Sequence, residues 1–248
     1  MGTPNLVDDE KVKEMSLAEW ERMKASSRIS RDPAYLNRVD RIVENLTAYV
    51  NWWEAADGWE VVVFQNSNNI NAFAMAGGKI GVYTGLIDIV ENDDQLAFVI
   101  AHEMAHVLEK HVHERLSEQM LMQSGGTVLG AAASVMGGSL IGYGVSSMYN
   151  AGSGVIGLSF NREKEREADI EGLFLMAKAG YEPEEAIRMI ELVDENVSAG
   201  RRAPEAWLST HPSTVDRMGK LASNMPQARE YYDQSKFLSS AGTSVIDI

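Results

Sequence analysis

Two histidines four positions apart, with a glutamate directly after the first, are the residues of this chain best placed to do chemistry: His102, Glu103 and His106. On a helix of 3.6 residues per turn, positions i and i+4 lie on one face, so both imidazole rings can reach a single metal ion. In this H-E-x-x-H pattern the glutamate takes the proton of a zinc-activated water and does not bind the metal. The spacing predicts one zinc per chain, ligands His102 and His106, and Glu103 as general base.

The residues around this motif predict that it lies on a helix. Residues 95–101 are apolar and rich in strong helix formers, and Asn92-Asp93-Asp94 offers an N-cap before them. After His106 the composition stays helical, with no Gly or Pro until Gly125. We therefore expect a long and largely buried helix.

A catalytic zinc takes three protein ligands and leaves one position for water, so a third ligand has to be found. The metzincin pattern needs Gly and His at the third and sixth positions after His106, where this chain has Glu109 and Val112. His111 and His113 lack the required spacing, and the helix would have to break to turn His111 inward.

A second helix offers the alternative. Glu165 and Asp169 are four positions apart in a charged segment that leads into an apolar helical pattern, so they share a face. Glu165 can bind the metal while Asp169 accepts a hydrogen bond from the distal nitrogen of a ligand histidine. The competing interpretation is a charged first turn that faces solvent.

Four sequence blocks in order resemble the gluzincin family that holds the BepA-like and LoiP-like periplasmic proteases, the mitochondrial Oma-type protease, HtpX and the CAAX prenyl protease. The resemblance covers roughly residues 61–221, and Ala76 departs from it by standing where the family usually has Pro. The blocks are Asn71-Ala72-Phe73 with the run Gly77-Gly78 to Leu86, His102 to His106, Glu165 and Asp169 with Gly172, and Ser209-Thr210-His211-Pro212 with Arg217.

The resemblance implies that Glu165 is the third zinc ligand and that Asp169 supports a ligand histidine. It also implies that His211 and Arg217 lie near the zinc, where their donors would stabilise an oxyanion. In the BepA-like branch the equivalent histidine can reach the zinc and block the water site, so His211 is a candidate switch. The alternatives are an exposed ring at a helix entry for His211 and a surface ion pair for Arg217.

Residues 61–64 and 80–83 are predicted to be strands, with Gly77 and Gly78 as the turn between them. Such a strand can pair its backbone with an extended peptide. The candidate substrate-binding residues are Asn71, Ala72, Phe73, Gly77 and Gly78. The alternative is a hairpin that only covers the metal helix.

Outside this hairpin the chain is predicted to be helical, at residues 17–24, 33–56 and 183–198 among others. We expect one domain over residues 1–248, with N-terminal helices in 1–57 and a catalytic core in 58–221. The fold class is α+β, mostly α: a compact zinc-metallopeptidase domain with a small sheet beside the metal helix.

The net charge of -14 argues against nucleic-acid binding, which depends on Lys and Arg at phosphates, and against adhesion to an anionic membrane. The first residues carry neither a basic nor an apolar signal region, so we expect no signal peptide in this sequence. The absence of Cys excludes disulfides and thiol nucleophiles but does not separate cytoplasm from periplasm.

Residues 119–161 form an uncharged segment between the two predicted zinc-binding stretches, and it holds ten of the 21 glycines. Three interpretations stay open: buried helices over the active site, a mobile lid or partner-docking loop, and insertion into a membrane. The same segment is our candidate for peripheral contact with a membrane or an envelope protein.

These observations predict a zinc-dependent endopeptidase. From the resemblance we expect unfolded or misassembled polypeptides as substrates and the bacterial periplasm as the compartment. The alternative is a latent zinc protein that acts as a chaperone or assembly partner, with its cleft closed by His211 or by residues 119–161.

Overall fold

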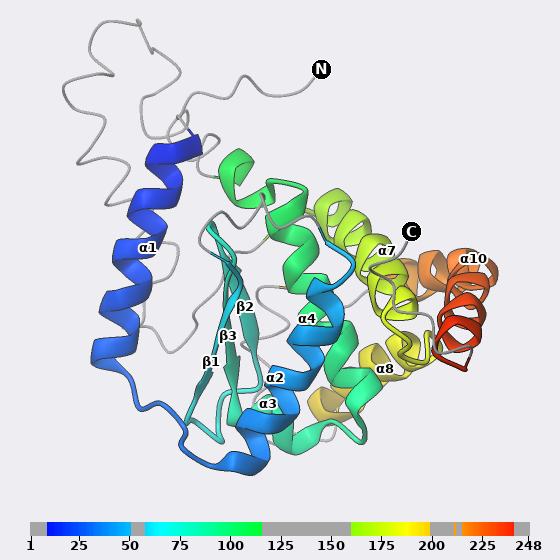
Figure 1. Cartoon of the computed structure of the whole chain (residues 1–248), viewed down its shortest axis with the longest axis horizontal. Helices are drawn as coiled ribbons and strands as arrows, with labels where there is room; N and C mark the ends of the chain where they lie inside the picture. The colour runs from blue at the N-terminus through cyan, green and yellow to red at the C-terminus, as the bar shows by residue number, and fades with distance from the viewer. Residues whose placement is uncertain (1–8, 51–57, 116–159, 199–210, 212–214, 241–248) are drawn as a thin grey trace, which may run out of the picture.

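The computed structural model describes residues 9–50, 58–115, 160–198, 211 and 215–240. Helices surround a small three-stranded sheet (Figure 1), which confirms the predicted class, α+β and mostly α. The elements in chain order are α1 (Asp9–Ser26), α2 (Pro33–Thr47), β1 (Glu60–Phe64), β2 (Ala72–Met75), β3 (Lys79–Tyr83), α3 (Thr84–Ile89), α4 (Asp93–Leu108), α7 (Arg162–Lys178), α8 (Glu185–Ser198) and α10 (Val215–Ser240).

The sheet has the order β1-β3-β2, so β3 is the central strand. It runs parallel to β1 and antiparallel to β2. The prediction that Gly77 and Gly78 join residues 61–64 to residues 80–83 was therefore wrong. They join β2 to β3, with φ of 87° and 72°, because two parallel strands need a longer crossover than a tight turn.

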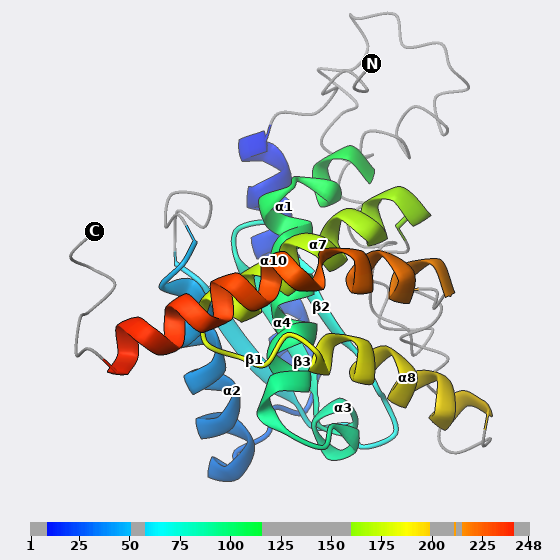
Figure 2. The ribbon, with the colours of Figure 1, turned by 90° about the vertical axis from the view of Figure 1, so that its right-hand side faces the viewer.

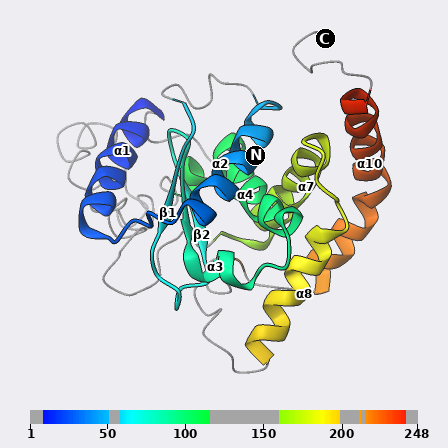
Figure 3. The same ribbon diagram turned by 60° about the horizontal axis from the view of Figure 1, so that its bottom comes forward.

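Side chains alternate between the two faces of the sheet. One face carries Val63, Ala74 and Ile80 into the core shared with α2 and α4. The other carries aromatic rings, among them Phe64 and Phe73, which pack against Trp20 of α1. Figure 3 shows α1 on one side of the strands and α2 with α4 on the other. The metal helix is thus held against a sheet that is covered on both faces.

Helix α4 carries the H-E-x-x-H motif and is buried along most of its length. The N-cap lies in the predicted stretch: it is Asn92, whose side chain accepts a hydrogen bond from the backbone N–H of Gln95 at 2.9 Å. The prediction of an uninterrupted helix was wrong. It ends at Leu108, a turn follows with Lys110 at φ 56°, and helical structure resumes at His111.

Helix α7 begins after Asn161, whose side chain accepts hydrogen bonds from two backbone N–H groups of the first turn. It lies very close to α4: a Cβ placed on Gly172 would stand 2.9 Å from the backbone nitrogen of His102. Only a residue without a side chain allows this approach. In Figure 2, α10 crosses in front of α7, and the two helices pack together.

Several element bounds differ from the prediction. The helix at Pro33 ends at Thr47 and not at residue 56, and residues 51–57 lie outside the described part. Helix α8 begins at Glu185, two residues after Pro183, which lies in the turn before it. The long α10, with Pro226 inside it, was not predicted.

Residues 119–159, most of the uncharged segment, also lie outside the described residues, so the three interpretations of it stay predictions. Among the helices that are described, none is both long enough and apolar enough to cross a membrane. The division into residues 1–57 and 58–221 stays a prediction as well.

Candidate metal centre

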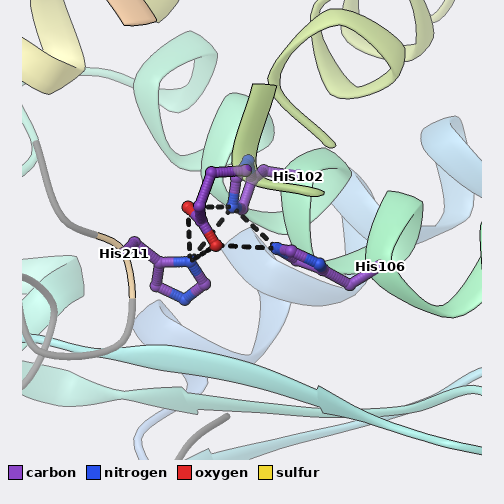
Figure 4. Close-up of side chains that lie close together, drawn as sticks. His102, His106 and His211 are labelled. Atoms are coloured by element: carbon purple, nitrogen blue, oxygen red, sulfur yellow. Dashed lines mark hydrogen bonds and ion pairs between the residues drawn. The ribbon is translucent and has the colours of Figure 1, made fainter. Parts of the chain in front are cut away.

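Four buried side chains from three stretches of the chain converge on one point: His102, His106, Glu165 and His211. The two histidines of the motif come from α4, Glu165 comes from the first turn of α7, and His211 precedes α10. One ligand atom from each lies within 4.8 Å of all the others. Figure 4 shows the three imidazole rings turned toward this common point.

The ligand atoms of His102, His106 and Glu165 are spaced as a tetrahedral zinc ion requires, and His211 lies at a similar distance from His102 and Glu165. Nε2 of His102 lies 3.1 Å from Nε2 of His106 and 3.2 Å from Nδ1 of His211. The carboxylate oxygens of Glu165 lie 3.1 to 3.6 Å from the three ring nitrogens. Zinc with ligand bonds of about 2.0 Å in a tetrahedron separates its ligand atoms by about 3.3 Å. The buried nitrogen and oxygen donors therefore fit zinc, the predicted cofactor.

Glu103 lies beside this group without belonging to it. Its Oε1 lies 3.0 Å from Nε2 of His211, and its side chain is 3% exposed. Burial alone would raise the pKa of Glu103, but the neighbouring imidazoles of His211, His106 and His102 together outweigh burial and lower it. The carboxyl group is therefore ionised at neutral pH, as a general base must be.

The His211 ring bridges two carboxylates, because its Nδ1 faces Glu165 and its Nε2 faces Glu103. Burial opposes a charge on this ring, but the two carboxylates outweigh burial and raise the pKa of His211 to about 10. The ring is 2% exposed, which does not fit the alternative of an exposed ring at a helix entry.

Asp169 and Arg217 form a buried pair behind His102. Nδ1 of His102 lies 3.1 Å from Oδ1 of Asp169. Arg217 donates to both oxygens of this carboxylate, at 2.7 and 2.6 Å, and it also donates to the backbone carbonyl of His211 at 3.3 Å. Burial opposes the charge on Asp169, but Arg217 and His102 together outweigh burial and lower its pKa. Arg217 is thus an internal residue and not a surface ion pair.

His106 has neighbours that the sequence did not indicate. Its Nδ1 lies 2.8 Å from Nδ1 of His111, and the Phe160 ring stacks on its face at 4.0 Å. Burial lowers the pKa of His106 and of His111 to about 4, so both rings are neutral at pH 7. In the sequence, His111 could be noticed only by its position five residues after His106. The turn at Lys110 is what brings its ring against His106.

The candidate substrate-binding residues lie at the two ends of β2. Asn71 directly precedes this strand, and Ala72 and Phe73 are its first two residues. All three are buried, and β2 packs on α4. Gly77 and Gly78 follow its far end, where a Cβ on Gly77 would stand 3.3 Å from the side chain of Leu17 in α1. The structure therefore does not gather these five residues at one place, and their contact with substrate stays a prediction.

An H-E-x-x-H helix, a buried glutamate on a second helix and a small sheet beside them define the class of zinc metallopeptidases. Within that class, the chain belongs to peptidase family M48, whose family model matches residues 33–225. The resemblance expected from the four sequence blocks is confirmed.

Curated relatives point the same way. The chain is 33% identical over 185 residues to the mitochondrial metalloendopeptidase OMA1 of Saccharomyces cerevisiae, covering 71% of this chain and 50% of that protein. It is 26% identical over 230 residues to the β-barrel assembly-enhancing protease of Escherichia coli (strain K12), covering 90% of this chain and 46% of that protein. The chain thus spans about half the length of these relatives.

Proposed function

We propose that this chain is a zinc-dependent endopeptidase that cleaves unfolded or misassembled polypeptides. The observation that carries the proposal is the convergence of His102, His106 and Glu165 at tetrahedral spacing, with the ionised Glu103 beside them. These are the three ligands and the general base that hydrolysis assisted by one zinc requires.

Zinc, when bound, acidifies a water molecule and polarises the carbonyl of the peptide bond. Glu103 takes the proton of the attacking water, because its carboxyl group is ionised and does not belong to the ligand group. The same carboxyl group then passes that proton to the leaving amine. No covalent bond to the protein is formed, in keeping with the absence of Cys in the chain.

His211 has two roles in this proposal. Its Nδ1 lies at the fourth position of the ligand group, and its Nε2 faces Glu103, so the ring covers both the water position and the base. The ring must swing away before turnover. Once displaced, its N–H group can donate to the oxyanion that forms on the carbonyl oxygen.

Arg217 was predicted to donate to the oxyanion as well. Two of its nitrogens are bound to Asp169 in the structure. We therefore assign it a positioning role: it holds Asp169, which holds the ring of His102.

For substrate and compartment we propose unfolded or misassembled envelope proteins in the bacterial periplasm. The support is the match to a protease named for enhancing β-barrel assembly over 90% of this chain. The net charge of -14 makes nucleic acid an unfavourable partner. Contact with a membrane or an envelope protein through residues 119–161 remains part of this proposal.

A second candidate function is a latent zinc protein that acts as a chaperone or assembly partner. The position of the His211 ring favours it, because a ring held between Glu165 and Glu103 closes the site. A chaperone would keep its activity without Glu103, whereas a peptidase would not.

Glu103→Gln separates the two functions. We expect the wild type to hydrolyse unfolded casein and the variant to be inactive, with about one zinc in each. Suppression of casein aggregation is measured in the same preparations. Zinc in both proteins without cleavage by either, together with equal suppression of aggregation, would favour the latent protein over the peptidase.

A further inference from the structure

The two histidines of the motif are supported by different neighbours on the side away from the metal position. Nδ1 of His102 faces the carboxylate of Asp169. Nδ1 of His106 faces the ring of His111, with 2.8 Å between the two Nδ1 atoms. His111 is 1% exposed, so it belongs to the interior of the site.

The chain reaches this arrangement through a break in the helix. Had α4 continued without interruption, the residue five positions after His106 would have pointed away from the His106 ring. The turn at Glu109 and Lys110, with a positive φ at Lys110, turns the chain so that His111 lies beside His106. A lysine in the left-handed region is uncommon, and here it places a side chain against a metal ligand.

A second contact lies beyond His111. Its Nε2 lies 3.2 Å from Oε2 of Glu167, on the first turns of α7. Glu167 is partly exposed and also lies 3.5 Å from Nζ of Lys164. The contacts therefore run from His106 through His111 to a carboxylate at the surface.

The ligand role of His106 gives these hydrogen bonds a direction. Its Nε2 is the atom in the ligand group, so the ring proton sits on Nδ1 and is donated to Nδ1 of His111. His111 must then carry its own proton on Nε2, where Glu167 accepts it. A residue at position 111 that cannot accept would leave the buried N–H of His106 without a partner, at a cost in free energy.

We propose that His111 is the positioning residue of His106. It fixes the tautomer and the ring orientation that His106 needs to bind zinc, as Asp169 does for His102, and it is not itself a ligand. This inference rests on the zinc site of the proposed function and assigns a role to a residue outside it.

Two substitutions separate hydrogen bonding from packing. His111→Phe keeps a ring of similar size but removes the acceptor. His111→Asn removes ring volume but keeps an acceptor, because Oδ1 of Asn stands close to where Nδ1 of His stands. His113→Phe, two residues further along the same turn of helix, is the matched control.

The measured quantities are the zinc dissociation constant, by competition with a chromogenic chelator, and the visible absorption of the Co²⁺-loaded protein. We expect His111→Phe to weaken zinc binding about 10- to 100-fold and to change the Co²⁺ spectrum, as outer partners of zinc-bound histidines do when they are lost. His111→Asn and His113→Phe should stay close to the wild type.

Wild-type affinity in His111→Phe, or equal weakening in His111→Phe and His111→Asn, would overturn the proposal. If the Phe variant does not fold by circular dichroism, Glu167→Ala takes its place, because it alters a partly exposed side chain. Glu167→Ala should weaken zinc binding, and unchanged affinity would overturn the proposal. Failure of the wild type itself to bind zinc would instead refute the zinc site of the proposed function.

Discussion

Arg217 donates hydrogen bonds from two nitrogens to the carboxylate of Asp169, at 2.7 and 2.6 Å, and both side chains are buried. The pair stands directly behind His102, whose Nδ1 lies 3.1 Å from the same carboxylate. A bidentate guanidinium holds a carboxylate in one orientation, so this pair fixes the direction of the His102 ring.

Replacing Asp169 by Asn tests that relationship. The amide keeps the shape but loses the charge that Arg217 and His102 share, so we expect zinc affinity to fall about 10- to 100-fold. Arg217→Lys should weaken binding as well, because an ammonium group cannot make the bidentate contact. Competition with a chelator measures the zinc affinity of both variants. An unchanged zinc affinity in Asp169→Asn would contradict the positioning role.

Arg217→Ala is expected to lower the stability of the fold as well as the affinity for zinc. It leaves the buried carboxylate of Asp169 without its cation, and breaking a buried pair in this way costs about 3–5 kcal/mol. Chemical denaturation of wild type and variant in the presence of a chelator measures this cost without zinc binding. A loss below about 1 kcal/mol, the range of exposed ion pairs, would show that the pair is not buried in solution.

Gly172→Ala tests how closely α7 must approach α4. The added Cβ would stand 2.9 Å from the backbone nitrogen of His102, so the helices must move apart. We expect a loss of about 1–3 kcal/mol in stability, and weaker zinc binding because Glu165 moves with α7. The control is Gly219→Ala on α10, where a Cβ meets nothing within 4 Å. That substitution should be neutral or stabilising by about 1 kcal/mol, since Ala favours helix. Equal effects of the two substitutions would count against the close contact.

His211→Ala tests whether this ring covers the fourth ligand position. Three ligands remain, so we expect the variant to bind zinc or Co²⁺, but with the fourth position open. Azide added to the Co²⁺-loaded variant should change its absorption at lower concentration than in the wild type. If wild type and variant respond to azide alike, the His211 ring does not occupy that position in solution.

The sequence predicted the parts of the site that local periodicity determines. His102 and His106, and Glu165 and Asp169, are pairs at i and i+4, so helix geometry alone puts each pair on one face. The packing of α4 against α7 is a tertiary contact, and its closeness depends on Gly172. Its position in the sequence did not show what it would contact.

What the sequence did not predict depends on contacts between distant segments or on single backbone angles. The helix break after Leu108 depends on the positive φ of Lys110. The residue types around Lys110 do not predict this backbone angle. The parallel pairing of β1 with β3 depends on the arrangement of the whole sheet. The residues of the two strands do not indicate whether the strands pair parallel or antiparallel. Helix α10 lacks a strong apolar stripe and contains Pro226, so its packing on α7 supports it more than its own periodicity does.

X-ray absorption at the zinc K-edge of the purified wild type, together with its zinc content, tests the central claim most directly. The account predicts one zinc per chain, bound by four nitrogen and oxygen ligands at about 2.0–2.1 Å, with the scattering of imidazole rings. In Glu165→Ala the set of atoms bound to the zinc should change, and the affinity for zinc should fall. A protein that holds no zinc after dialysis, or a zinc surrounded by oxygen atoms without imidazole, would contradict the assignment of His102, His106 and Glu165 as its ligands.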